Sequence, residues 1–222
     1  MDLKEVIKQR HSVRQYLDQP LAIEDIKALK EKIQECNQKS GLHIQFITNE
    51  PKAFQSQMAH YGKFEGVKNY IALVGKKSKD LEEKCGYYGE QLVLFAQQLG
   101  FNTCWVVLTY KKMRSRMQIE PDEKLVAVIT IGSGANQGKP HRSKTIQDVV
   151  KSDEELPDWF CNGVTYALLA PTALNQQKFE LSYNHHKVFL KAKRGFYTRI
   201  DLGIVKYHFE IGAGQEHFEW DE

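Results

Sequence analysis

The strongest constraint on the fold is a long amphipathic helix that the sequence predicts at residues 81–99. Apolar residues recur in it at helical spacing, at Leu92, Phe95, Ala96 and Leu99. Gly100 supplies a stop signal, and a buried strand is expected soon afterwards at residues 103–107. A helix that returns so quickly into a buried strand favours a sheet with helices packed on it.

The other expected elements alternate in the same way along the chain. Helices are predicted at about residues 3–9, 23–36, 111–118, 159–169 and 197–211, and strands at about 42–48, 70–74, 125–131, 179–183 and 187–191. Residues 132–144 are expected to form a loop. This order favours an α+β fold, with a mixed central sheet and helices on both of its faces.

A weak internal repeat suggests two related halves that meet at about residue 150. Two sets of three residues share one relative spacing, namely Gly89, Phe95 and Gly100, and Gly203, Phe209 and Gly214. The predicted helix–turn–strand at 29–49 likewise parallels the one at 164–184. Three matched positions can arise by chance, but they suggest a first half at 1–150 and a shorter second half at 151–222.

The composition excludes several other classes of protein. Hydrophobic residues make up 41% and charged residues 27%, which is typical of a globular chain with a core. The net charge of +3 is too small to indicate a nucleic-acid partner, and no apolar run approaches the roughly 18 residues of a membrane span. The N-terminus lacks the apolar region of a secretory signal, so we expect a cytoplasmic protein.

Nothing in the spacing of cysteines and histidines indicates a metal site. Four cysteines lie far apart without a CxxC pair, at Cys36, Cys85, Cys104 and Cys161. The pair His185–His186 has no cysteine or carboxylate partner at ligand spacing. Scattered thiols in a reducing compartment are the simpler interpretation.

A polar segment near the N-terminus is the first candidate for chemistry. Arg10, Ser12 and Arg14 alternate along it, and alternate side chains of an extended segment point to the same side. Guanidinium groups bind oxyanions through two hydrogen bonds at once, so this face suits a phosphate or the polar edge of a heterocycle. A solvated charged loop would give the same pattern.

Two further segments place polar groups beside a helix end. Pro171 ends an apolar helix, and Thr172 and Asn175 follow it with side chains that can form hydrogen bonds. Residues 99–105, Leu-Gly-Phe-Asn-Thr-Cys-Trp, run from the long helix into a strand. Each segment taken alone is also explained as ordinary architecture, either a helix stop before a polar loop or a tight helix-to-strand turn.

Together the three segments resemble the nitroreductase family of FMN enzymes. Members of that family carry an Arg-x-Ser-x-Arg segment that lines the flavin, an Ala-Pro-Ser-x-x-Asn-like segment, and a Leu-Gly-x-x-Thr-x-Trp-like passage into a strand that faces the flavin ring. The resemblance continues through residues 121–128 and into 139–150. There, Arg142 and Lys144 occupy the region from which the family usually supplies basic phosphate contacts.

The resemblance implies several further flavin contacts. His11 lies inside the Arg-x-Ser-x-Arg segment. Lys63 falls near the place of a flavin-contacting lysine in the family, although an exposed loop lysine is an equal alternative. Val107 and Leu108 come after Trp105, where family members direct backbone N–H groups at the flavin N5.

The order of the segments departs from the family pattern. Residues 36–40 stand where an ordinary member carries its Pro-Ser-x-x-Asn segment, and they do not match it; the match is at 171–175. Ordinary nitroreductases are two-fold dimers whose two subunits each contribute one of these segments to a flavin site. The chain resembles a subgroup that looks like a fusion of two such subunits. We therefore expect an intrachain pseudo-dimer, monomeric in solution, with one FMN per chain.

The resemblance also implies the activity. NADH or NADPH would donate a hydride to the flavin, which would then reduce a nitroaromatic, a quinone or a similar small-molecule acceptor. The cofactor performs this chemistry, so no catalytic side chain is expected. Three alternatives stay open: a flavin oxidoreductase of other specificity, a flavin-binding scaffold without turnover, and a non-flavin module if the three motifs are coincidental.

Overall fold

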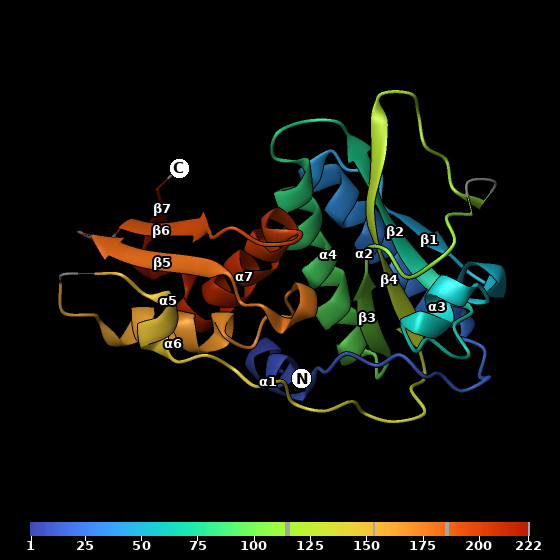
Figure 1. Cartoon of the computed structure of the whole chain (residues 1–222), viewed down its shortest axis with the longest axis horizontal. Helices are drawn as coiled ribbons and strands as arrows, with labels where there is room; N and C mark the ends of the chain where they lie inside the picture. Colours follow the sequence, from blue (N-terminus) through green and yellow to red (C-terminus); the bar gives the residue numbers. More distant parts are fainter. Residues whose placement is uncertain (114–115, 153, 185–186, 222) are drawn as a thin grey trace.

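The computed structural model describes residues 1–113, 116–152, 154–184 and 187–221. Two sheets lie at opposite ends of the molecule, and two long helices, α4 (Leu81–Gln98) and α7 (Thr198–Ala213), cross the middle between them (Figure 1). The predicted α+β architecture is therefore confirmed. None of the helices in the described ranges is both long and apolar enough to cross a membrane.

The larger sheet has four strands. In spatial order they are β1 (Gln45–Ile47), β2 (Asn69–Lys76), β4 (Glu123–Gly132) and β3 (Asn102–Val106). All of its ladders are antiparallel. A parallel bridge between Ser12 and Thr103 continues it beyond β3. The central sheet, predicted as mixed, is thus antiparallel through its strands and mixed only at this edge.

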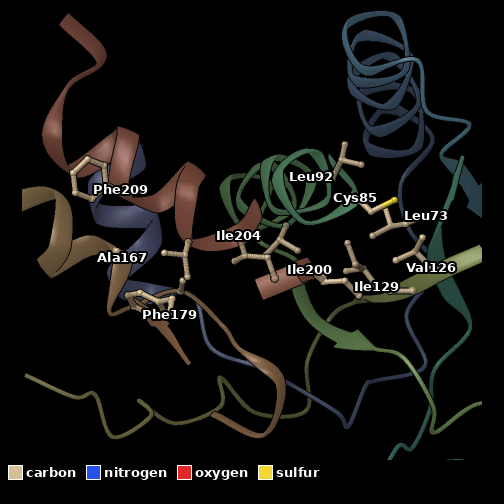
Figure 2. Close-up of a cluster of buried hydrophobic side chains, with 14 of the residues drawn as sticks. Leu73, Cys85, Leu92, Val126, Ile129, Ala167, Phe179, Ile200, Ile204 and Phe209 are labelled. Atoms are coloured by element: carbon tan, nitrogen blue, oxygen red, sulfur yellow. The ribbon is translucent and has the colours of Figure 1, made fainter. Parts of the chain in front are cut away.

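The two faces of this sheet have different covers. Alternation along β2 directs Ile71 and Leu73 into a cluster with α4, α7 and α2 (Ile23–Ser40), part of which is drawn in Figure 2. Tyr70, Ala72 and Val74 enter a second cluster on the other face. That face is covered by a 3-10 turn (Pro51–Phe54), the short helix α3 (Gln57–Tyr61) and irregular chain.

The smaller sheet lies in the C-terminal part. It consists of β5 (Phe179–Asn184), β6 (Lys187–Ala192) and β7 (Glu219–Trp220), the first pair antiparallel and the second parallel. Helix α6 (Asp158–Ala167) precedes it, and the short helix α5 (Ile146–Val149) lies just before that. Helix α7 follows β6 and returns to the centre.

The contact between α4 and α7 is close because glycines form it. A Cβ atom on Gly86 would lie 2.1 Å from the carbonyl oxygen of Ile200, and one on Gly203 would lie 2.0 Å from that of Glu83. Real Cβ atoms do not approach backbone oxygens so closely. Glycine at these positions therefore sets the distance between the two central helices.

The order of elements does not test the predicted repeat. The first part runs α2, β1, β2 and α4, with a 3-10 turn and α3 between the two strands, whereas the second runs α6, β5, β6 and α7, with a 3-10 turn between α6 and β5. The paired glycines Gly100 and Gly214 both follow a long helix at positive φ, +88° and +82°. One hydrophobic cluster nevertheless runs continuously from residues of α2 to residues of α7. The two halves and their boundary at residue 150 stay a prediction.

Several predicted boundaries are wrong. Helix α2 continues past residue 36 to Ser40, where Gly41 adopts a left-handed conformation and ends it, and β1 is correspondingly shorter than residues 42–48. The helix expected at 111–118 is absent at 111–113, and residues 114–115 lie outside the described part of the chain. The expected loop at 132–144 is found, beginning after Gly132.

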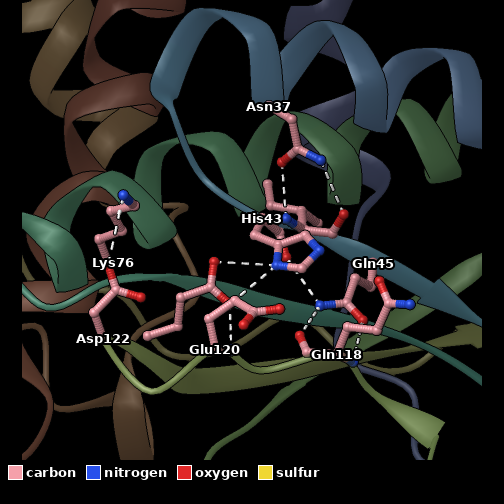
Figure 3. A network of polar contacts seen from close by, with 9 residues as sticks. Asn37, His43, Gln45, Lys76, Gln118, Glu120 and Asp122 are labelled. Carbon is pink, nitrogen blue, oxygen red and sulfur yellow. Dashed lines mark hydrogen bonds and ion pairs between the residues drawn. The ribbon is translucent and has the colours of Figure 1, made fainter.

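A polar network stabilises the connection from α2 to β1 (Figure 3). The Asn37 side chain accepts a hydrogen bond from the Ile44 amide at 2.8 Å and donates one to the Ile44 carbonyl at 2.9 Å. Beside it, His43 Nδ1 lies 3.0 Å from a carboxylate oxygen of Glu123, at the start of β4. This network stabilises the β1 edge of the larger sheet. Its residues do not line the cavity described below.

Candidate functional site

A cavity of about 590 Å³ brings together segments that are far apart in the sequence. Its walls come from residues 10–15, from Lys63, from the loop at 136–141 and from residues 171–175. Eight of the predicted site residues line it: Arg10, His11, Ser12, Arg14, Lys63, Pro171, Thr172 and Asn175. The two separated motifs of the sequence thus share one cavity.

The N-terminal wall is an extended segment that follows α1 (Leu3–Gln9). The Val13 amide donates to the Thr103 carbonyl at 3.0 Å, and the Arg14 carbonyl accepts from the Glu65 amide at 3.0 Å. Val13 is buried in the second hydrophobic cluster. Because side chains alternate, its neighbours Ser12 and Arg14 face the cavity, as the spacing predicts.

The loop at 136–141 supplies lining residues that sequence reasoning missed. Gly138 has φ +71°, and a Cβ atom there would lie 2.7 Å from the Cβ of His11, so this loop packs directly on the N-terminal wall. The lining residues that were not predicted are Gln15, Asn136, Gly138, Lys139, His141 and Leu174. The sequence predicted a loop at 132–144 but not which of its residues would line a cavity.

The opposite wall is a strained loop held by many hydrogen bonds. Leu174, Asn175 and Gln177 have φ of +53°, +51° and +45°, a region that costs energy for residues other than glycine. Thr172 Oγ1 accepts from the Gln177 amide at 3.0 Å, and the Gln177 side chain donates to Asn175 Oδ1 at 2.9 Å. Strained backbone fixed in this way is common at ligand-binding sites.

Asp201 fastens this loop to the start of α7. Its carboxylate accepts a hydrogen bond from the Ala173 amide at 2.9 Å and another from the Gln176 side chain at 2.9 Å. Only 4% of the residue is exposed. Burial raises the pKa of this carboxyl from 3.8 to about 6, against the opposing effect of the two hydrogen bonds.

This raised pKa predicts a specific pH dependence of stability. The folded protein holds the Asp201 proton more tightly than the unfolded chain, so the group's stabilising contribution is complete below pH 3.8 and lost as the pH rises through about 6. The lost part is roughly 3 kcal/mol, at about 1.4 kcal/mol for each pKa unit. Between pH 4 and pH 7, wild-type unfolding free energy should therefore fall by more than that of Asp201→Asn, as measured by urea denaturation. Asp158→Asn, at an exposed carboxylate, should retain the wild-type slope; an unchanged slope in Asp201→Asn would contradict the assignment.

The cavity carries positive charge. Four cationic side chains line it, Arg10, Arg14, Lys63 and Lys139, and none of its described lining residues is a carboxylate. Arg10 is only 4% exposed, and its Nε has no hydrogen-bond partner. Burial lowers the pKa of this guanidinium, with partial compensation from Glu90. An anionic occupant with hydrogen-bond acceptors would satisfy this arrangement.

Four predicted site residues do not line the cavity. Val107 packs against the main hydrophobic cluster, and Leu108 is 62% exposed. The Arg142 carbonyl accepts a hydrogen bond from Asn175 at 2.9 Å, and the Lys144 ammonium donates to the Gln177 carbonyl at 2.8 Å. The geometry gives Arg142 and Lys144 a part in holding the strained loop, and their predicted phosphate contacts stay a prediction.

Within the described ranges, no group of three or more His, Cys, Asp or Glu side chains could hold a metal ion. His185 and His186 lie outside the described residues.

Comparison with known proteins gives one family and one fold. The family model described as "Putative TM nitroreductase" matches residues 2–213. A crystal structure described as a putative nitroreductase from Thermotoga maritima is 26% identical, with a TM-score of 0.65, over 96% of this chain and 83% of that one. A search of curated proteins found none that matches.

Two more distant structures share the fold. One, described as a putative nitroreductase in complex with FMN from Desulfovibrio desulfuricans, is 17% identical, with a TM-score of 0.54, over 70% of this chain and 98% of that one. Another, described as a putative NADH dehydrogenase/NAD(P)H nitroreductase from Parabacteroides distasonis, is 20% identical, with a TM-score of 0.51, over 66% and 95%. Since the family model covers nearly all of the chain, the protein belongs to the nitroreductase family described as "Putative TM nitroreductase".

Proposed function

We propose that the protein is an FMN-dependent oxidoreductase that takes electrons from NADH or NADPH and reduces a nitroaromatic, a quinone or a similar small molecule. The observation that carries this proposal is the single cavity shared by the Arg10–Arg14 segment and the Pro171–Asn175 segment. The resemblance assigns both segments to flavin binding. Membership of the nitroreductase family supports the reaction class.

The residues of the cavity fit FMN. The buried Nε of Arg10 lacks an acceptor, and the cationic lining would balance a phosphate group. Arg14, Lys63 and Lys139 are the candidates for the phosphate, and Ser12, Thr172 and Asn175 offer groups for the polar edge of the ring. Bound FMN would supply the redox chemistry by accepting a hydride from the nicotinamide and passing electrons to the second substrate.

The side chains would then bind and orient rather than react. The pKa of His11 is lowered from 6.5 by burial, by the charge of Arg10 and by His141, so this imidazole is neutral at pH 7. The positive charge of Arg10 and Arg14 would also favour the reduced, more negative state of the flavin. This role requires no nucleophile or acid from the chain.

We further propose that one chain holds one complete site as a monomeric pseudo-dimer. The structures from Desulfovibrio desulfuricans and Parabacteroides distasonis are each matched over nearly their whole length but over only 70% and 66% of this chain. The remainder is about the size of residues 151–222, which carry the Pro171–Asn175 segment. Buried free thiols at Cys36, Cys85 and Cys104 suit the reducing, cytoplasmic setting expected for such an enzyme.

The first test is the stoichiometry of bound flavin. Purified protein saturated with FMN and separated from free ligand should release close to one FMN per chain on denaturation, and sedimentation should give a monomer. Protein that takes up no FMN would contradict the cofactor, and one FMN per two chains would contradict the complete site within one chain.

Turnover is tested separately, because a scaffold without activity would also bind FMN. Anaerobic mixing of the yellow protein with NADH or NADPH should bleach the flavin absorbance, and a nitroaromatic or a quinone should restore it. Bound flavin that neither donor reduces would favour the scaffold alternative.

A further inference from the structure

A buried carboxylate lies behind the cavity, at Glu90 of α4. The residue is 0% exposed. Its oxygen Oε1 lies 4.0 Å from the Nε of Arg10 and 2.9 Å from Nε2 of His208, and its Oε2 accepts a hydrogen bond from the Trp105 indole at 2.8 Å. Removing a carboxylate from water costs free energy unless the group is paired and hydrogen-bonded. Here three separate segments of the chain supply the partners.

His208 holds the carboxylate from the side of α7. Its Nε2 lies 2.9 Å from Oε1 of Glu90, and its Nδ1 lies 3.2 Å from the carbonyl oxygen of Tyr166. The imidazole therefore bridges Glu90 of α4 and the backbone of α6.

Arg10 is the member of this cluster that reaches the cavity. It is 4% exposed, lines the cavity and has an unpartnered Nε. An arginine side chain loses considerable rotamer entropy when it is held in one conformation, so its position depends on the groups that contact it. Glu90 is the carboxylate that the structure places within 4.0 Å of its guanidinium.

We propose that Glu90 is a positioning residue that holds the guanidinium of Arg10 in the cavity wall, ready for the anionic cofactor. This inference rests on the proposed binding of FMN. Trp105 of β3 and His208 of α7 fix the carboxylate, and the carboxylate fixes Arg10. Helix α7 would thus support the site from the C-terminal part of the chain as well as through Asp201.

The chain contains a matched control for this role. Glu210 of α7 is also buried, at 7% exposed. It accepts a hydrogen bond from the Trp220 indole at 2.8 Å and another from the Tyr87 hydroxyl at 2.5 Å. It joins the same two central helices but does not line the cavity and has no contact with Arg10.

A double-mutant cycle tests the proposal. FMN affinity would be measured by quenching of flavin fluorescence for wild type, Glu90→Gln, Arg10→Ala and the double variant. Glu90→Gln should weaken binding at least tenfold, and adding it to Arg10→Ala should change affinity by less than twofold, because its effect passes through Arg10. Glu210→Gln should stay within twofold of wild type.

Several outcomes would overturn the proposal. These are an unchanged affinity in Glu90→Gln, additive effects in the double variant, or an equal loss in Glu210→Gln. If Glu90→Gln does not fold, the pair Trp105→Phe and Trp220→Phe replaces it. The first should weaken FMN binding severalfold and the second should not, and equal behaviour would contradict the role. Wild-type protein that does not bind FMN would instead refute the proposed function.

Discussion

Replacing Gly203 with alanine is expected to destabilise the protein by about 3 kcal/mol, the upper end of the usual cost of overpacking. The added Cβ would lie 2.0 Å from the Glu83 carbonyl oxygen and 2.5 Å from the Tyr87 nitrogen, both backbone atoms of α4. Backbone atoms cannot rotate away, so α4 and α7 would have to separate. The higher helix propensity of alanine would return at most about 1 kcal/mol.

The measurement is urea denaturation of apo protein, with Gly41→Ala as the control. Gly41 has φ +71°, but a Cβ atom added there would meet no atom within 4 Å, so alanine should cost only about 1 to 2 kcal/mol of backbone strain. A Gly203→Ala midpoint shifted no more than that of Gly41→Ala would show that the helix pair can relax, and that glycine does not set its spacing.

The meeting of two segments that are far apart in the sequence was predictable, because each segment carries a recognisable motif. The side-chain alternation at Arg10, Ser12 and Arg14 and the polar residues after Pro171 are local patterns, and the resemblance predicted that the two segments share one site. The cavity confirms that they lie together. Their contact with flavin stays a prediction.

The loop at 136–141 could not be predicted in the same way. Its path depends on Gly138 packing against His11, a contact between segments without a shared pattern. The resemblance implies phosphate contacts from Arg142 and Lys144, whereas Lys139 is the basic residue of this loop that lines the cavity. Short loops take their conformation from what they pack against.

The absence of the expected helix at residues 111–113 has a physical cause. Tyr110 and Met117 are buried in the cluster on the second face of the sheet, and Met113 packs against it. Apolar residues anchoring irregular chain to a sheet can imitate the spacing of an amphipathic helix. The sequence pattern therefore did not reveal that these residues pack as irregular chain.

A substitution in either of the two separated motifs should weaken flavin binding, which is the sharpest consequence of a complete site within one chain. Arg14→Ala should weaken FMN binding about 10- to 100-fold, the loss expected for one hydrogen bond to a charged group, and Asn175→Ala about 2- to 10-fold, the loss expected for one between neutral groups. For Asn175 part of the loss would arise in the loop, since alanine at φ +51° is strained and its hydrogen bond to the Arg142 carbonyl is missing.

The control for Asn175 is Asn37→Ala, because Asn37 also bridges backbone groups, at Ile44, but lies outside the cavity. It should lower stability and leave FMN affinity unchanged. Riboflavin, which lacks the phosphate, separates the two motifs further. If Arg14 binds the phosphate, Arg14→Ala should barely change riboflavin affinity, whereas Asn175→Ala should weaken it as much as it weakens FMN. An Asn175→Ala protein that binds FMN as tightly as wild type would show that the second motif lies beside the flavin site without belonging to it.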